Sequence, residues 1–319
     1  MRARRVLVTG AAGFLGSHLV DRLVARGERV TGLDDLSTGR ASNLEGARAS
    51  GRFDLVRGDV LDPLPEGPWD HVWHLACPAS PPRYQADPIR TARICFEGTL
   101  NALRACGPGT RLFLASTSEV YGDPDVHPQP ETYRGAVNPV GPRACYDEGK
   151  RVAETLAYDW RRATGLDLRV ARIFNTYGPR MDPADGRVVS NLIVQALRGE
   201  AMTLYGGGAQ TRSFCYVDDL IDGFLALMDA EAAPEGPVNL GNPDEFAVAD
   251  LAALVAEKVE ARTGRRAPVS ARPLPQDDPR QRRPDIALAG TLLGWSPEVA
   301  LAEGLDRTIA HIAGELATA

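Results

Sequence analysis

The sequence predicts an α/β fold, in which a doubly wound parallel sheet carries a smaller, discontinuous α/β lobe. Short apolar runs alternate with amphipathic stretches through the first half of the 319 residues, a pattern typical of a sheet covered by helices on both faces. A glycine-rich turn directly follows the first of these runs. With 44% hydrophobic residues, the chain can build one large domain or two closely packed ones.

Six segments of the first half are expected to be strands. They are short, rich in β-branched residues or leucine, and bounded by turn residues. These strands are expected at 5–10, 29–34, 53–60, 71–76, 111–117 and 167–175. Helices between them are expected at 14–26, 90–106 and 144–164. Strands that alternate with helices form a parallel sheet, because each helical crossover returns the chain to the end of the sheet at which the previous strand began.

The character of the sequence changes after residue 178. A segment rich in proline, glycine and charged residues begins there and is followed by helix candidates near 188–198 and at 217–230. A short apolar run at 237–241 is expected to return to the main sheet. We therefore expect a larger domain made of 1–178 and 214–242, and a smaller lobe made of 179–213 and 243–319.

The composition argues against several classes of function. A net charge of −6 and the lack of a basic run argue against nucleic acid or a membrane surface as partner. No apolar stretch is long enough to span a membrane, and the N-terminus does not resemble a signal peptide. The five cysteines form no CxxC pattern and the histidines are scattered. We therefore expect reduced thiols, no metal site and a cytoplasmic location.

The glycine-rich turn predicts a dinucleotide site of the Rossmann type. Gly10, Gly13 and Gly16 run from the end of the first strand into the start of the first helix, where glycines let the backbone approach a pyrophosphate. Asp34 ends the second strand; a carboxylate there accepts hydrogen bonds from ribose hydroxyls and repels a 2′-phosphate. NAD is therefore expected rather than NADP, although Arg40 is close enough in sequence to accept that phosphate.

A second motif carries the chemistry of a hydride-transfer enzyme. Tyr146 and Lys150 are four residues apart in a predicted helix, so they share one face. A lysine beside a tyrosine favours the phenolate, and we expect the tyrosine pKa to fall below its usual value of about 10. Such a tyrosine takes the proton of an alcohol while a hydride leaves the carbon. Thr117, Ser118 and Glu119 end a buried strand, at the sheet edge where ligands bind.

Together these motifs resemble the extended short-chain dehydrogenase/reductase family. Within that family the chain is similar to the UDP-glucuronate decarboxylases, and the resemblance covers nearly the whole sequence. The matching stretches are HLACPASPPRY (74–84), STSEVYGDPDVHPQ (116–129), NPVGPRACYDEGKRVAE (138–154), RVARIFNTYGPRM (169–181), DGRVVSNLI (185–193), LYGGGAQTRSFCYVDDL (204–220) and QDDPRQRRPDI (276–286).

The resemblance implies a reaction and a set of residues. NAD oxidises the sugar of UDP-glucuronate at C4, CO2 leaves, and the hydride returns to give UDP-xylose. Thr117 and Ser118 hold the reacting hydroxyl, and Glu119 lies near C5. The related 4,6-dehydratases carry Asp-Glu in place of Ser118 and Glu119, because they must expel a hydroxyl. Arg282 is expected to hold the substrate carboxylate and to help protonate C5. The alternatives are that Arg283 does this instead, or that Arg282 is only a solvent-exposed charge in a basic loop.

The remaining expected contacts also come from this resemblance and from the glycine motif. The expected catalytic residues are Tyr146, Lys150, Glu119, Thr117, Ser118 and Arg282. The expected NAD contacts are Gly10, Gly13, Phe14, Leu15, Gly16, Asp34, Asp35, Thr38, Gly39, Asp59, Val60, Leu75, Tyr146, Lys150, Thr176 and Arg187. The expected substrate contacts are Arg93, Asn101, Asn175, Ser190, Asn191, Tyr205, Arg212 and Arg282.

Two positions depart from the family pattern. Cys95 replaces a usual asparagine, and Cys77 replaces a frequent serine. We interpret both as packing substitutions, because the sequence offers no cationic neighbour that would make either thiol reactive. The helices at 90–106 and 144–164 resemble the pair that forms a four-helix bundle in dimeric members, so a homodimer is expected. Apolar faces on these helices are also compatible with an ordinary core.

Three other functions remain open. An oxidative decarboxylase that releases a UDP-4-keto-pentose and NADH would share the same catalytic residues. A 4-epimerase would leave the segment 276–286 without a purpose. A non-enzymatic NAD-binding regulator on the same fold would not require both Tyr146 and Lys150.

Overall fold

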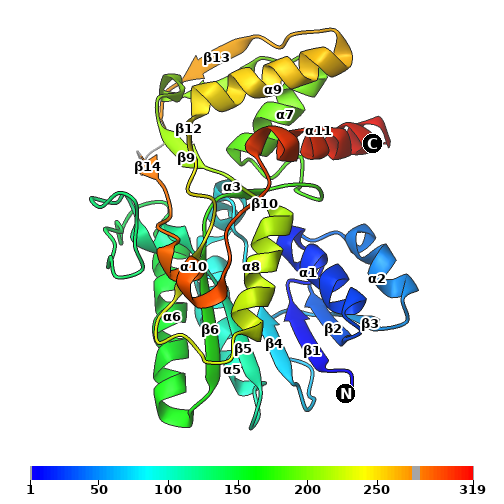
Figure 1. The fold of residues 1–319 in the computed structure, drawn as a ribbon, viewed down its shortest axis with the longest axis vertical. Coiled ribbons are helices and arrows are strands. Elements are labelled where there is room, and N and C mark those ends of the chain that lie inside the picture. Colours follow the sequence, from blue (N-terminus) through cyan, green and yellow to red (C-terminus); the bar gives the residue numbers. More distant parts are fainter. Residues whose placement is uncertain (1, 275–280, 319) are drawn as a thin grey trace.

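A seven-stranded parallel sheet forms the centre of the protein (Figure 1). The computed structural model describes residues 2–274 and 281–318. The strand order is β11-β6-β5-β4-β1-β2-β3, and every neighbouring pair is parallel. The strands are β1 (Arg5–Thr9), β2 (Arg29–Asp34), β3 (Phe53–Arg57), β4 (His71–His74), β5 (Arg111–Thr117), β6 (Asp167–Ile173) and β11 (Val238–Leu240). The predicted fold class is confirmed.

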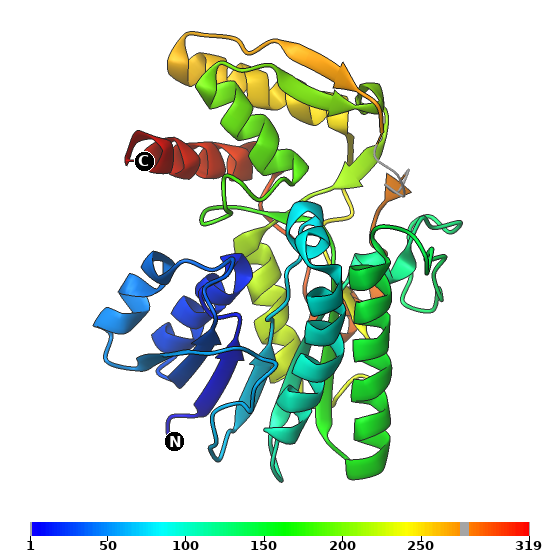
Figure 2. The same ribbon diagram turned by 180° about the vertical axis from the view of Figure 1, so that it is seen from behind.

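Helices cover both faces of the sheet (Figures 1 and 2). One face carries α1 (Phe14–Ala25), α2 (Glu45–Ala49) and α8 (Val217–Asp229). The other carries α4 (Pro88–Arg93), α5 (Thr99–Arg104) and α6 (Ala144–Thr164). Successive residues of β1 point to opposite faces. Val6 and Val8 therefore join the core under α1 and α8, whereas Leu7 joins the core under α5 and α6, which is why the strands are apolar throughout.

The helix expected at 90–106 differs from its predicted form. The short helix α3 (Pro81–Ala86) precedes it, and α4 begins at Pro88, where the Asp87 carboxylate accepts the N–H of Arg90. A single π-helical turn, Ile94–Gly98, then separates α4 from α5. This turn lies where α4 and α5 pack against α6, and such a turn leaves no mark in the apolar periodicity of a sequence.

The smaller lobe is formed by segments from the second half of the chain. Its helices are α7 (Val188–Arg198), α9 (Val248–Thr263) and α11 (Leu301–Thr318). Its strand pairs are β8 (Met202–Tyr205) with β13 (Val269–Arg272), and β9 (Thr211–Ser213) with β12 (Glu245–Ala247) and β14 (Gln281–Arg282). Between the lobes, β7 (Thr176–Tyr177) pairs with β10 (Cys215–Tyr216).

One helix complicates the expected division into lobes. α10 (Ala287–Leu293) packs against β11 and α8 of the larger domain, although its residues were assigned to the smaller lobe. The exact division between the lobes therefore stays a prediction. Of the helices in residues 2–274 and 281–318, none has the length and apolar character needed to cross a lipid bilayer.

Candidate active site

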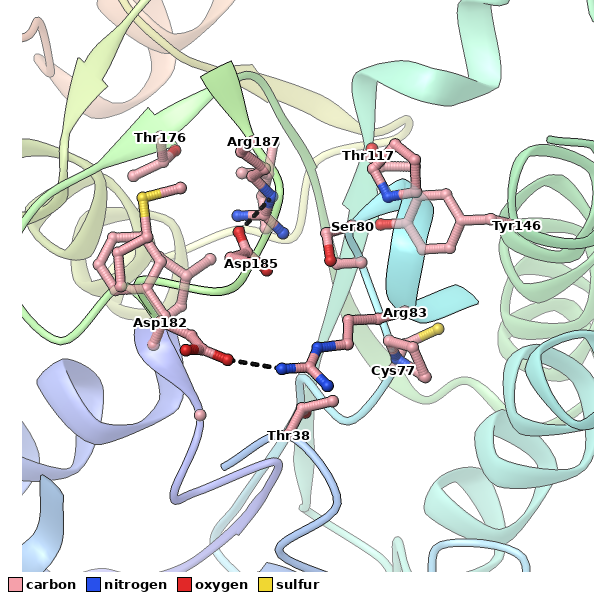
Figure 3. Close-up of a pocket in the computed structure, with 18 of the residues that line it drawn as sticks. Thr38, Cys77, Ser80, Arg83, Thr117, Tyr146, Thr176, Asp182, Asp185 and Arg187 are labelled. Carbon is pink, nitrogen blue, oxygen red and sulfur yellow. Dashed lines mark hydrogen bonds and ion pairs between the residues drawn. The ribbon is translucent and has the colours of Figure 1, made fainter. Parts of the chain in front are cut away.

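A cavity of about 800 Å³ lies beyond the carboxyl ends of the sheet strands, between the two lobes (Figure 3). The sheet order reverses between β1 and β4, and ligands of doubly wound folds bind at such a point. Most of the residues expected at the site line this cavity. They are Gly10, Gly13, Phe14, Leu15, Gly16, Asp34, Asp35, Thr38, Asp59, Val60, Leu75, Thr117, Ser118, Glu119, Tyr146, Lys150, Asn175, Thr176, Arg187, Asn191, Tyr205, Arg212 and Arg282.

Four expected contacts lie outside the walls of the cavity. Arg93 pairs with Glu97 on the surface of the helix pair, with its Nε 2.8 Å from a carboxylate oxygen. Asn101 donates to the backbone carbonyl of Val60 at 2.9 Å, and buried Ser190 donates to that of Arg187 at 3.0 Å. Gly39 packs close to Asp34. Direct substrate contact by Arg93, Asn101 or Ser190 therefore finds no support in this geometry.

The glycine turn is shaped for a group that needs close approach to the backbone. Gly10 has a φ of +71°, and a Cβ there would come within 2.9 Å of the backbone of Ala76. A Cβ on Gly16 would lie 1.9 Å from the carbonyl oxygen of Gly10. The N-terminus of α1 follows, with no side chain capping its N–H groups. These features fit the pyrophosphate of a dinucleotide.

The acidic end of the cavity fits the adenosine part of NAD. The Asp34 carboxylate accepts the N–H groups of Ala12 and Leu36, each at 2.8 Å, which fixes its orientation. Burial raises the pKa of Asp34, and these N–H groups oppose the rise. Arg40 contacts Asp182 at 2.8 Å and Glu315 at 3.1 Å. Because carboxylates already engage this guanidinium, it is poorly suited to bind a 2′-phosphate.

Tyr146 meets Thr117 at the end of β5 (Figure 3), and Lys150 lines the same cavity. The Tyr146 ring stacks on Tyr84, with centroids 5.1 Å apart and planes 2° apart. The Lys150 ammonium lies 5.9 Å from the centroid of the Tyr146 ring and donates to the carbonyl of Ala115 at 2.9 Å. Together these contacts fix the tyrosine in the wall of the cavity.

The expected fall in the pKa of Tyr146 is not found. Burial raises the pKa well above the ordinary value of tyrosine, and a hydrogen bond with Thr117 and the charge of Arg187 only partly oppose this. The phenolate loses its hydration in a site where the tyrosine is 5% exposed. The sequence predicted that Lys150 lies beside Tyr146, but it could not predict how deeply the tyrosine is buried.

Glu119 forms the centre of a buried charge cluster. Arg282 contacts both carboxylate oxygens, at 2.5 and 2.9 Å, and Arg143 contacts one of them at 2.9 Å. Burial alone would raise the pKa of Glu119, but the two arginines outweigh burial and lower it to about 2. Arg282, rather than Arg283, lines the cavity. Asp147 lies in the field of this cluster, and burial and Glu119 raise its pKa to about 7.

Several cavity residues were not singled out from the sequence. Arg143 directly precedes α6, the catalytic helix that carries Tyr146 and Lys150. It lies in a stretch that was noted only for its resemblance to the family. Arg83 and Asp182 form an ion pair of 2.7 Å across the cavity (Figure 3). The buried hydroxyl of Ser80 also lines the cavity, and it has no hydrogen-bond partner among the described residues. The stretch HLACPASPPRY was the available signal for Ser80 and Arg83.

The chain is similar to proteins of known name. Residues 6–241 match the NAD dependent epimerase/dehydratase family. UDP-glucuronic acid decarboxylase 1 of Danio rerio is 52% identical over 314 residues, which are 98% of this chain and 73% of the relative. UDP-glucuronic acid decarboxylase 1 of Arabidopsis thaliana is 51% identical over 306 residues, which are 96% of this chain and 69% of the relative.

Solved structures of similar shape cover both lobes. A UDP-glucose 4-epimerase of Thermotoga maritima, with UDP-glucose, has a TM-score of 0.88 and 30% identity, and the match covers 98% of this chain and 99% of that one. A UDP-glucuronic acid 4-epimerase of Bacillus cereus, in complex with UDP-glucuronic acid and NAD, has a TM-score of 0.85 and 27% identity, with the same coverage.

Proposed function

The chain belongs to the NAD dependent epimerase/dehydratase family, and from this we infer that it decarboxylates UDP-glucuronate to UDP-xylose with no net consumption of NAD. One observation carries the inference: about half of the residues, over nearly the whole chain, are identical to those of UDP-glucuronic acid decarboxylases. The arrangement of the cavity supports the same reaction, because it combines a dinucleotide cradle, a buried tyrosine and lysine, and an arginine suited to a carboxylate.

The glycine turn and Asp34 would hold NAD, which would supply reversible hydride transfer at C4 of the glucuronosyl ring. The ketone at C4 is β to the C6 carboxylate, so it draws in the electrons that the departing CO2 leaves behind. As the phenolate, Tyr146 would take the proton of the C4 hydroxyl at its Oη and give it back when the hydroxyl is restored. The positive charge of a bound nicotinamide would oppose the rise that burial causes in the pKa of Tyr146. Thr117 orients the Tyr146 hydroxyl, and Ala115 holds the Lys150 ammonium beside it.

Arg282 is proposed to hold the carboxylate that leaves. Its two Nη groups are engaged by Glu119, and its Nε is buried without a hydrogen-bond partner among the described residues. An arginine that lines the cavity with one N–H unsatisfied can donate to a carboxylate while its pair with Glu119 remains. Glu119 would then fix the guanidinium near C5, where a proton is needed after CO2 leaves.

The second lobe is proposed to bind the UDP part of the substrate. Arg212 lines the cavity from β9, and the guanidinium group is suited to donate to the oxygens of a diphosphate. Asn175, Asn191 and Tyr205 line the same cavity and supply hydrogen-bonding groups.

Replacing Arg212 with alanine should raise the KM for UDP-glucuronate strongly. An unchanged KM would show that Arg212 does not contact the substrate.

We also propose a homodimer formed by the helices on one face of the sheet. Ile89 on α4, Phe96 in the π-helical turn and Val152 on α6 are 76%, 44% and 42% exposed. Apolar side chains this exposed on neighbouring helices support burial against a second copy.

The five free thiols support a reducing, cytoplasmic compartment.

The test of the reaction is an NMR time course with UDP-glucuronate and no added reductant, while absorbance monitors NADH. UDP-xylose that forms without accumulation of NADH supports the closed cycle. A 4-keto-pentose with stoichiometric NADH would identify an oxidative decarboxylase instead. UDP-galacturonate as the product would identify a 4-epimerase, the activity named for the similar solved structures.

A further inference from the structure

Two cysteine thiols meet at the wall of the cavity. Cys77 follows β4 and lines the cavity, and Cys95 lies buried in the π-helical turn between α4 and α5. Their sulfur atoms are 3.5 Å apart, within hydrogen-bonding distance. The other three cysteines each donate their thiol to a backbone carbonyl. Cys77 and Cys95 therefore form a dithiol pair that the proposed reaction does not use.

From this geometry we propose that Cys77 and Cys95 are an oxidisable pair, which a hydroperoxide converts into an intramolecular disulfide. A disulfide bond is about 2.05 Å long. Each sulfur therefore has to move by less than an ångström from the observed separation of 3.5 Å. The inference goes beyond the proposed function, because the chemistry at the two sulfurs does not depend on which sugar reaction the chain catalyses.

The two thiols differ in a way that assigns them separate roles. Cys77 is half-buried and faces the cavity, so a small oxidant can reach it. A hydrogen bond with Cys95 and the charge of Lys150 lower the pKa of the Cys77 thiol, against the effect of burial. The pKa of the Cys95 thiol is raised by its bond with Cys77 and by burial. Because Cys77 lines the cavity and Cys95 is buried behind it, Cys77 is the thiol that reacts first and Cys95 is the thiol that resolves the product.

The redox step balances with hydrogen peroxide as the oxidant. The Cys77 sulfur attacks one peroxide oxygen, the O–O bond breaks, and Cys77 becomes a sulfenic acid with release of water. The Cys95 sulfur then attacks the Cys77 sulfur, the S–O bond breaks, and a second water leaves. Two electrons pass from the two thiols to the peroxide, and a dithiol reductant reverses the change.

Closing this bond affects the catalytic helix. The Cys95 sulfur packs against Gly149 of α6, where an added Cβ would lie only 2.9 Å from it, and Lys150 is the next residue. Drawing the Cys95 sulfur toward Cys77 removes this contact and also shifts the cavity wall at Cys77. We expect the disulfide form to lose about tenfold or more of the activity, since small misplacements of catalytic groups have effects of this size.

The experiment treats the purified holoenzyme with hydrogen peroxide, blocks the remaining thiols with N-ethylmaleimide and digests the chain with trypsin. Cys77 and Cys95 fall on separate tryptic peptides, residues 58–83 and 94–104. The expected product is these two peptides joined, with two hydrogens fewer than their sum. Recovery of both peptides alkylated, or of Cys77 as a sulfinic acid while Cys95 stays alkylated, would overturn the proposal.

Variants separate the roles of the two thiols. Activity after peroxide is expressed relative to the same variant untreated, then measured again after dithiothreitol. Cys77→Ser should remove the loss. Cys95→Ala should make it irreversible under excess peroxide, because a sulfenic acid without a resolving thiol is oxidised further to the sulfinic acid, which dithiothreitol does not reduce. Cys106→Ser, which alters a half-buried thiol outside the cavity, should behave as the unmodified protein. Full recovery of Cys95→Ala with dithiothreitol would refute the resolving role. The mass readout remains valid even if the proposed reaction is wrong.

Discussion

Tyr146 is held by contacts on several sides. Its ring stacks on Tyr84, its hydroxyl bonds with Thr117, and Lys150 lies over its ring. The hydroxyl is the only part of the side chain that can take part in proton transfer. The ring contributes packing, which a phenylalanine would preserve. Chemistry and packing at this residue can therefore be measured separately.

Tyr146→Phe should lower kcat by about 10²–10⁴-fold, the usual contribution of a general acid-base group, with little change in KM. The NMR assay with UDP-glucuronate measures both. Tyr84→Phe is the matched control, because the buried Tyr84 hydroxyl has no hydrogen-bond partner among the described residues. A loss of similar size in Tyr84→Phe would mean that packing, rather than proton transfer, explains the effect.

Asp147 gives the protein a dependence on pH. Its pKa is about 7 in the folded chain and 3.8 in the reference state. Between these values the unfolded chain holds fewer protons than the folded chain, so the stability falls as the pH rises. Asp147→Asn should therefore stabilise the protein above neutral pH, on the order of 2–4 kcal/mol, and change the stability little near pH 4.

Urea unfolding at about pH 4 and pH 8 measures this difference. Glu148→Gln is the control, because Glu148 is the next residue on the same helix and its side chain is 41% exposed. That substitution should leave the free energy of unfolding nearly unchanged at both values of pH. An equal gain for Asp147→Asn at both values would show that the carboxyl does not titrate between them.

Among the elements, the π-helical turn and α6 depend on one another. The turn presents Cys95 to α6, and α6 accommodates it by having glycine at position 149. The same turn ends at Gly98, where a Cβ would lie 3.1 Å from Val60. The π-helical turn is therefore closely packed on both sides.

Gly149→Ala should destabilise the protein by about 1–3 kcal/mol, the usual cost of overpacking. The added Cβ would lie 2.9 Å from the Cys95 sulfur. Gly290→Ala in α10 is the matched control, because no atom lies within 4 Å of its added Cβ. This control should be neutral or stabilising, since alanine favours helices. Equal destabilisation in both variants of a thermal unfolding series would contradict the packing argument.

Most elements could be predicted from local patterns, because the apolar spacing of a strand or helix is a property of a few neighbouring residues. β1, β2, α1 and α6 lie within one residue of their expected limits. The π-helical turn could not be predicted, because such a turn leaves the apolar periodicity of a helix unchanged. The packing of α10 against β11 joins segments far apart in sequence, and no local pattern encodes such a contact.

At the scale of the whole molecule, the residues of the site also fall into those that local sequence patterns could predict and those that they could not. The glycine turn, Tyr146 and Lys150 could be located because their spacing follows from the geometry of one turn or one helix. The pairs Arg143–Glu119 and Arg83–Asp182 join distant segments, and a sequence does not say which charges meet. The burial that raises the pKa of Tyr146 likewise depends on the packing around the cavity.

The assembly offers a test at this scale. A double variant, Ile89→Glu with Val152→Glu, should convert the expected dimer into a monomer, because it places charges on the exposed apolar helices. Light scattering coupled to gel filtration measures the mass. Val140→Glu is the control, because Val140 is 91% exposed but lies in a loop. A monomeric parent protein, or a double variant that remains a dimer, would refute the proposed interface.

The position of β11 at the edge of the sheet has a consequence for the order in which the protein is made. Residues 238–240 complete the sheet by pairing with β6, yet the segment from 176 to 216 lies between them and builds much of the second lobe. A nascent chain on the ribosome therefore exposes the open edge of β6 until most of the polypeptide has been synthesised. A gene fragment cut at the apparent lobe boundary would keep that edge open permanently, and its product should aggregate.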